Sequence, residues 1–181
     1  MFNEELFVKY PYAFSRNAWT GEIYEDEETG FPYSLDECLP KGWSKLFWMC
    51  MEELREPLEK AKQINTFYFL QVKEKYGEMC LYNNGSTEEV LEIINKYEYL
   101  SQFVCDVCGK PADIMTHGWI ENVCLDCFNK RKDHEQDKFE DIKINTTPIR
   151  IRFSQNNREE IKYDYTETWK HYLKEIESER S

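Results

Sequence analysis

Two pairs of cysteines constrain the fold of this chain more than any other sequence feature. Each pair has the spacing Cys-x-x-Cys, and fifteen residues separate the two pairs. Two such pairs are typical of a tetrahedral zinc site in which the protein supplies all four ligands. A closed site of this kind is structural rather than catalytic. The predicted ligands of one structural zinc ion are Cys105, Cys108, Cys124 and Cys127.

The spacing also predicts the local fold around the metal. A tight turn brings the two sulfurs of one pair together, and Gly109 eases the turn that follows Cys108. The intervening residues are expected to form a hairpin that turns near His117-Gly118. The second pair then opens a helix, whose N-terminal amides favour thiolate charge. This arrangement is a treble clef; two disulfides or an iron–sulfur cluster are alternatives for the same cysteines.

The composition indicates a folded and strongly acidic protein. Among 181 residues, 35 acidic side chains exceed 23 basic ones, which gives a net charge of −12, and 41% of the residues are apolar. No apolar run is long enough to cross a membrane, and residues 1–5 lack the basic start of a secretory signal. We therefore expect a cytoplasmic protein. The acidity argues against a broad nucleic-acid-binding surface, because such affinity comes from lysine and arginine.

These features predict an α+β fold in three parts. Residues 1–104 form an acidic α/β core, and residues 1–42, punctuated by proline and glycine and rich in aromatic residues, wrap around it. Residues 105–135 form the four-cysteine module. Residues 136–181 add a C-terminal strand and helix that pack on the core. The expected architecture is a helix–β-hairpin–helix core that carries a treble-clef or zinc-ribbon module.

Apolar spacing predicts the two helices of the core. The first spans residues 43–56, and Pro57 should end or kink it because proline lacks an N–H and clashes with the preceding turn. Its apolar face comprises Trp43, Leu46, Phe47, Cys50 and Leu54. The second helix is predicted to begin with a capping box from Ser86 to Glu89 and to end near Ser101. Its apolar face comprises Val90, Leu91, Ile94 and Tyr97.

Strand patterns occupy two further regions. Residues 66–73 and 78–83 are predicted to form a hairpin, with Gly77 at the turn. Residues 149–153 alternate apolar and basic side chains, which predicts a half-buried strand with its arginines on the polar face. A C-terminal helix follows, with an apolar face made of Trp169, Tyr172, Leu173 and Ile176.

The turn of the first hairpin concentrates polar and aromatic side chains. One interpretation is a charged surface turn. The other is a binding edge, in which lysines meet an anionic ligand or an acidic partner and tyrosines stack or donate hydrogen bonds. The candidate binding residues are Lys73, Lys75, Tyr76 and Tyr82.

Nucleic-acid binding is an alternative that we do not favour. Its candidate contacts are Lys130, Arg131, Lys132, Arg150 and Arg152. Nearby aspartates and glutamates oppose it. An HNH-like nuclease is less favoured still, because His117, His134 and His171 do not occupy the places of a general base and catalytic metal ligands. The acidic run Glu25–Glu28 is expected to be a solvated loop, with DNA mimicry as the alternative.

Three cysteines lie outside the two pairs. Cys50 falls on the apolar helix face and Cys80 in a strand, so both are expected to be core residues rather than ligands or nucleophiles. Cys38 follows Asp36 and Glu37, and this acidic setting should raise its pKa and reduce its reactivity.

The order of motifs over residues 8–128 resembles a family of small, uncharacterised proteins of bacteriophages and bacterial genomes. The Lys-Glu-Lys-aromatic-Gly block is the most distinctive part of the resemblance, whereas Cys80 stands where family members usually carry an arginine. The matching motifs are Tyr10-Pro11 with Phe14, Gly42-Trp43, residues 72–77 through Tyr82, Ser101, Cys105-x-x-Cys108-Gly109, Gly118-Trp119-Ile120 and Cys124-x-x-Cys127. The resemblance implies a phage or mobile-element context and no established activity.

Taken together, these observations favour a non-enzymatic binding protein with structural zinc. Its expected partner is a host protein or a small anionic ligand, and no membrane is involved. If the protein is encoded by a phage, the host cytoplasm is its expected location.

Overall fold

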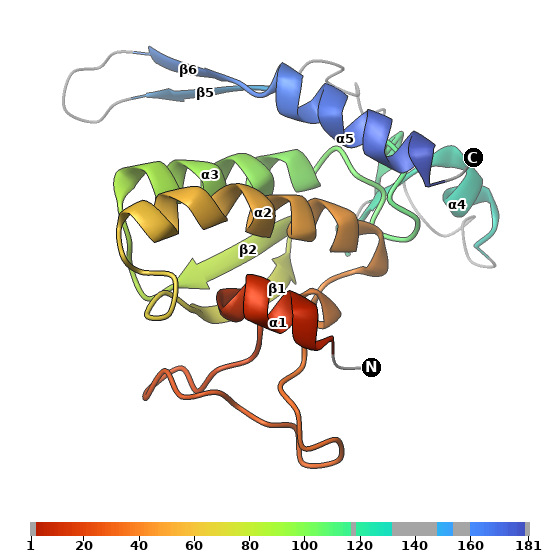
Figure 1. The fold of residues 1–181 in the computed structure, drawn as a ribbon. Coiled ribbons are helices and arrows are strands. Elements are labelled where there is room, and N and C mark those ends of the chain that lie inside the picture. Colours follow the sequence, from red (N-terminus) through yellow and green to blue (C-terminus); the bar gives the residue numbers. More distant parts are fainter. Residues whose placement is uncertain (1–2, 117–118, 132–147, 154–159, 180–181) are drawn as a thin grey trace.

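The computed structural model describes residues 3–116, 119–131, 148–153 and 160–179, and it has the predicted α+β fold. Two helices lie side by side over a two-stranded antiparallel sheet (Figure 1). The helices are α2 (Ser44–Lys60) and α3 (Glu88–Ser101), and the strands are β1 (Phe69–Lys75) and β2 (Glu78–Asn83). Their facing side chains form one apolar core. Within the described residues, no helix is long and apolar enough to span a bilayer.

Helix α2 has the predicted apolar face but does not end at the predicted place. Leu46, Phe47, Cys50 and Leu54 are all fully buried. The prediction was an end or a kink at Pro57, and the end is wrong, because Pro57 lies inside the helix, which continues to Lys60. Burial of Pro57 and of the following Leu58 in the core offsets the hydrogen bond that proline cannot donate.

Helix α3 begins one residue later than the capping box predicts. The side chain of Thr87, rather than that of Ser86, caps the helix by accepting a hydrogen bond from the Val90 amide. The Ser86 hydroxyl is engaged elsewhere, at 2.6 Å from the Gln63 side-chain oxygen. The apolar face also shifts: Ile93 is buried, whereas Leu91 is 37% exposed.

The β1–β2 hairpin closes through the two-residue turn Tyr76-Gly77. Both residues have positive φ, 55° and 74°, as a type I′ turn requires. Lys75 pairs with Glu78 across it, and the Glu74 carboxylate accepts a hydrogen bond from the Gly77 amide at 2.7 Å. Strand β1 begins three residues later than predicted, because residues 64–66 form a turn before Phe67 enters the core.

Side chains of α3 protect the outer edge of β2. The outward-facing amide of Met79 donates to the Ser101 hydroxyl at 2.8 Å, and the amide of Leu81 donates to the Glu98 carboxylate at 2.7 Å. Unpaired edge amides would otherwise invite another strand. Burial raises the pKa of Glu98, although its hydrogen bond with Leu81 counters this effect.

Replacing Ser101 by alanine should lower the free energy of unfolding by about 1 to 3 kcal/mol. The substitution leaves the Met79 amide buried without its acceptor, and Ser101 is fully buried. Chemical denaturation measures the loss. Ser178→Ala is the matched control, because Ser178 also ends a helix and bonds three residues back but is exposed. Equal stability of the two variants would contradict a role for Ser101 in protecting the edge.

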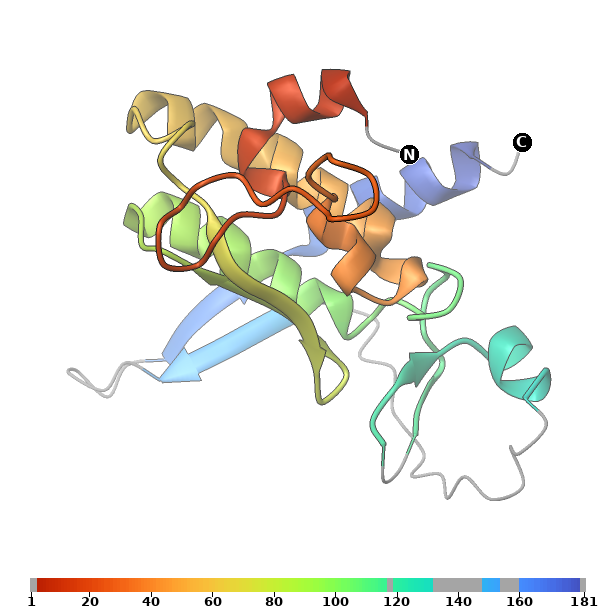
Figure 2. The same ribbon diagram turned by 90° about the horizontal axis from the view of Figure 1, so that it is seen from below.

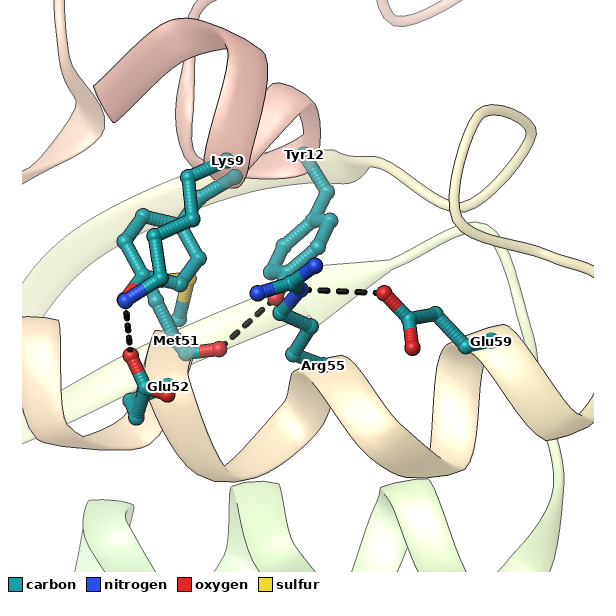
Figure 3. A network of polar contacts seen from close by, with 7 residues as sticks. Lys9, Tyr12, Met51, Glu52, Arg55 and Glu59 are labelled. Atoms are coloured by element: carbon teal, nitrogen blue, oxygen red, sulfur yellow. Dashed lines mark hydrogen bonds and ion pairs between the residues drawn. The ribbon is translucent and has the colours of Figure 1, made fainter. Parts of the chain in front are cut away.

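The N-terminal segment packs against α2, as Figure 3 shows. It begins with the short helix α1 (Glu4–Lys9), which the sequence analysis did not predict. The buried Tyr12 hydroxyl donates to the carbonyl of Met51 at 2.7 Å, and Lys9 pairs with Glu52 at 2.8 Å (Figure 3). The wrap is incomplete, since Trp19 is 94% exposed.

The C-terminal residues form a second hairpin and a long helix. Strands β5 (Ile149–Phe153) and β6 (Glu160–Asp164) pair, and α5 (Thr166–Ser178) adds Trp169, Tyr172 and Ile176 to the core. Strand β6 was not predicted.

The predicted faces of β5 are reversed. Arg150 and Arg152 point towards α3, where both bond to Asn95, whereas Ile151 is 56% exposed. The hydrogen bonds that both arginines donate to Asn95 hold their face of β5 against α3 and leave Ile151 on the opposite face.

Candidate metal centre

The four cysteines lie in a compact module formed by residues 105–131. A tight turn follows Cys105, whose carbonyl accepts from the Gly109 amide at 2.9 Å, and Gly109 has a φ of 73°. Strands β3 (Ile114–Met115) and β4 (Asn122–Val123) then pair as a hairpin. Helix α4 (Leu125–Asn129) begins directly after Cys124. The predicted treble-clef order of turn, hairpin and helix is confirmed, while the hairpin tip at His117-Gly118 lies outside the described residues.

The geometry of the four sulfurs fits one metal ion. All four Sγ atoms lie within 4.8 Å of one another, and those of Cys108 and Cys124 are 3.6 Å apart. A tetrahedral site with metal–sulfur bonds of about 2.3 Å places its sulfurs roughly 3.8 Å apart. Cys105 and Cys124 are buried, Cys127 is half-buried and Cys108 is exposed. No other group of potential ligands with such geometry occurs among the described residues.

The pKa values of Cys105, Cys108 and Cys127 show why a bound cation would stabilise the cluster. Burial raises the pKa of the Cys105 thiol to about 11, although neighbouring backbone amides counter the effect. Burial and the neighbouring thiols also raise the pKa of Cys127. Burial opposes ionisation of Cys108 too, but the Lys110 amide and the other three thiols stabilise its thiolate and lower its pKa. A bound metal ion supplies the positive charge that stabilises all four thiolates together.

The turn at the metal centre packs directly on the backbone of the core. The Gly42 amide donates to the carbonyl of Asp106 at 2.8 Å, and a Cβ atom on Gly42 would lie 2.0 Å from the Cys105 carbonyl oxygen. The Tyr172 hydroxyl of α5 donates to the carbonyl of Gly109 at 2.6 Å. Only glycine fits at position 42, a requirement that the sequence analysis missed.

A second joint connects the module to the β1–β2 turn. The side-chain amide of Asn122 donates to the carbonyl of Gly77, and a Cβ atom on Gly77 would lie 2.8 Å from Ile120. Between the turn and the module lies a cleft of about 330 Å³. Its lining residues are Lys73, Glu74, Lys75, Tyr76, Trp119 and Ile120. We call this the turn–module cleft.

The turn–module cleft contains three of the four binding residues predicted for the hairpin. Lys73, Lys75 and Tyr76 line it, while Tyr82 lies outside it, with the Lys73 ammonium 5.4 Å from its ring centre. Trp119 joins the cleft from the module and is 77% exposed. Trp119 could not be predicted as a member of this site, because it is far from Tyr76 in the sequence and the two residues line one cleft only in the folded chain.

The structure does not bring the predicted nucleic-acid contacts together. Lys130 and Arg131 follow α4, where Arg131 pairs with Glu121, and Lys132 lies outside the described residues. Arg150 lies over the Tyr99 ring at 5.3 Å and, like Arg152, bonds to α3. In both views the β5–β6 hairpin and α4 occupy opposite ends of the molecule (Figures 1 and 2).

The remaining candidates take ordinary structural positions. Cys50 is fully buried as predicted, whereas Cys80 is half-buried. Partial desolvation raises the pKa of Cys38, and the charges of Glu37 and Asp36 add to this shift.

Asp26 of the acidic run organises an exposed turn by accepting hydrogen bonds from the Thr29 and Glu28 amides, which lower its pKa. His171 faces Glu175 on α5, while His117 and His134 lie outside the described residues.

Comparison with protein-family models, curated proteins and solved structures finds no match to this chain. The resemblance to small phage and bacterial proteins therefore stays a prediction. The features of the molecule that bear on function are the four-cysteine cluster and the surfaces beside it.

Proposed function

We propose that this is a non-enzymatic binding protein, stabilised by one structural zinc ion, that engages a small anionic ligand at the turn–module cleft. The closed cluster of four thiolates carries the proposal, since all four sulfurs lie within 4.8 Å of one another. Four protein thiolates fill a tetrahedral zinc site and leave no position for a substrate or a reactive water. Zinc suits this role because it binds thiolates strongly and takes four ligands in a tetrahedron at structural sites.

The position of the module explains what the metal would do. Its own apolar cluster consists mainly of Cys105, Val123, Cys124 and Phe128, which is too small to support folding alone. A bound ion supplies the missing folding energy. The stabilised hairpin then holds Trp119 beside the β1–β2 turn. Zinc in this proposal builds one wall of the binding site without touching the ligand.

The setting and the alternatives follow from the same observations. The resemblance to phage proteins suggests a host cytoplasm, with a host protein as an alternative partner. Nucleic-acid binding through the basic groups receives less support, because Arg131, Arg150 and Arg152 are held by contacts within the chain. Nothing in the described part of the chain favours nuclease chemistry over binding.

Native mass spectrometry tests the metal centre directly. We expect the folded protein to carry the mass of one zinc ion and to lose it on denaturation, because the ligands come together only in the fold. Elemental analysis identifies the metal. A folded protein without metal, one that carries iron, or a chain lighter by the hydrogens lost in two disulfides would each contradict the proposal.

A further inference from the structure

We propose that the turn–module cleft binds a nucleoside phosphate, with the base between Tyr76 and Trp119 and the phosphate at Lys73 and Lys75. This inference rests on the proposed function and names its ligand class. The cleft unites two aromatic side chains, two lysines and a volume of about 330 Å³, contributed by two separate parts of the chain.

The two aromatic side chains are presented to solvent rather than to the core. Tyr76 is 75% exposed and Trp119 is 77% exposed. Within the described residues neither ring stacks on another aromatic ring, whereas Phe14, Phe47 and Trp169 each pack against one. Exposed aromatic faces of this kind are the platforms on which proteins stack nucleic-acid bases.

The backbone at Tyr76 strengthens the argument. Its φ of 55° lies in the left-handed region, where asparagine, aspartate or glycine is the usual residue of a type I′ turn. A bulky residue such as tyrosine rarely adopts this left-handed backbone conformation, because its side chain crowds the backbone. Such departures concentrate at binding sites, and here the departure directs an aromatic ring to the mouth of the cleft.

The lysines add a local positive charge to a protein of net charge −12. Lys73 and Lys75 are two residues apart on β1 and therefore share one face of the hairpin. Neither forms an ion pair within the described residues, even though Glu78 pairs in register with Lys75. In the part of the chain that the structure describes, six other lysines do form ion pairs, namely Lys9, Lys45, Lys60, Lys96, Lys110 and Lys170.

The remaining acid in the cleft is already engaged. The Glu74 carboxylate accepts a hydrogen bond from the Gly77 amide at 2.7 Å, which fixes it at the turn, and the two lysines of the cleft outnumber it. The lysines are thus the groups free to meet an anion. Each already lies near a tyrosine ring, and the Lys75 ammonium is 5.5 Å from the centre of the Tyr76 ring. A phosphate beside that ring can be reached without a large rearrangement.

Size and rigidity select a small ligand over a protein segment. A cavity of about 330 Å³ lies at the lower end of the range of small-molecule sites, roughly 300 to 1,000 Å³. The two walls are joined by the bond from Asn122 to Gly77 and by the close packing of Ile120 on that glycine. Walls joined before the ligand arrives reduce the entropy lost on binding.

Isothermal titration calorimetry of the metal-loaded full chain tests the inference with AMP and CMP as probes. Both should bind, whereas adenosine and inorganic phosphate, each of which offers half of the contacts, should bind at least about tenfold more weakly. Trp119→Ala should weaken AMP binding by about tenfold through the lost stacking surface. Lys75→Gln should also weaken it and reduce its dependence on salt.

Two variants serve as matched controls. Trp19→Ala removes another exposed tryptophan away from the cleft, and Lys130→Gln removes an exposed lysine of the module outside it. Both should bind AMP like the original protein. An effect of Trp19→Ala equal to that of Trp119→Ala would overturn the proposed site.

Failure of this inference can be separated from failure of the proposed function. Metal-loaded protein that binds neither AMP nor CMP at millimolar concentration overturns the nucleotide site and leaves the structural metal in place. A single-stranded oligonucleotide that binds when both mononucleotides do not also overturns it, in favour of a nucleic-acid strand. Absence of metal from the folded protein instead contradicts the proposed function itself.

Discussion

Replacing Cys108 by serine is expected to release the metal and to cause a large loss of thermal stability. Structural zinc contributes about 10 to 16 kcal/mol in isolated zinc-finger peptides, which equals or exceeds the whole stability of a typical domain. The three remaining thiolates cannot close the site. Because Cys108 is exposed, the serine hydroxyl itself should destabilise the fold little. The loss of thermal stability therefore measures the loss of the metal. Metal content and the thermal midpoint are measured together.

Cys38→Ser is the matched control for this experiment. Cys38 is also exposed, but it lies outside the four-cysteine cluster. It should retain the metal and the original midpoint. A chelator should lower the midpoint of the original protein and of the Cys38→Ser variant, and should have no effect on Cys108→Ser. If all three proteins melt together with and without chelator, the metal is not structural.

Gly42→Ala is expected to lower the free energy of unfolding by about 3 kcal/mol or more. This value is at the upper end of the range usually found when a side chain is inserted where there is no space for it. The added methyl group would lie 2.0 Å from the Cys105 carbonyl oxygen and 2.7 Å from the Gly109 nitrogen. Both are backbone atoms of the metal-binding turn, so no side chain can move aside to make room. In a chain of this size the midpoint should fall by about 2 to 4 °C for each kcal/mol.

Gly30→Ala distinguishes this clash from a general effect of losing a glycine. Gly30 has a φ of 70° and no atom within 4 Å of the added Cβ position. Its replacement therefore costs only the strain of a left-handed backbone, about 1 to 2 kcal/mol. Gly42→Ala should also weaken metal binding, which Gly30→Ala should not. Equal effects of the two substitutions on stability and on metal affinity would contradict the proposed contact.

Local spacing was sufficient to predict the parts of the molecule that depend on local geometry. The Cys-x-x-Cys pairs place two sulfurs on one tight turn, so the cluster of four follows once the hairpin folds back. Helical periodicity likewise identified the buried face of α2, because a helix turns every 3.6 residues whatever surrounds it. The β1–β2 hairpin followed from β-branched and aromatic content with a glycine at its turn.

Contacts with segments distant in the sequence explain the smaller errors. Thr87 and Ser86 are both good helix caps, and the contact of Ser86 with Gln63, 23 residues away, helps to decide between them. Pro57 was expected to end or kink α2, and the helix does not end there, because burial in the core outweighs the missing hydrogen bond. The reversed faces of β5 depend on Asn95, which no alternation within the strand can reveal.

The amino-acid sequence by itself thus determined the α+β class, the four-cysteine cluster and the position of the lysines at the hairpin turn, since each depends on neighbours a few residues apart. Only the tertiary structure decided which parts of the core the four-cysteine module contacts. Trp119 lines a cleft with the β1–β2 turn, to which the module is joined by the bond of Asn122 to Gly77, 45 residues away. Gly42 is required only because the Cys105 turn packs on it across the core. Contacts between segments so distant depend on how the whole chain packs, and no local pattern encodes them.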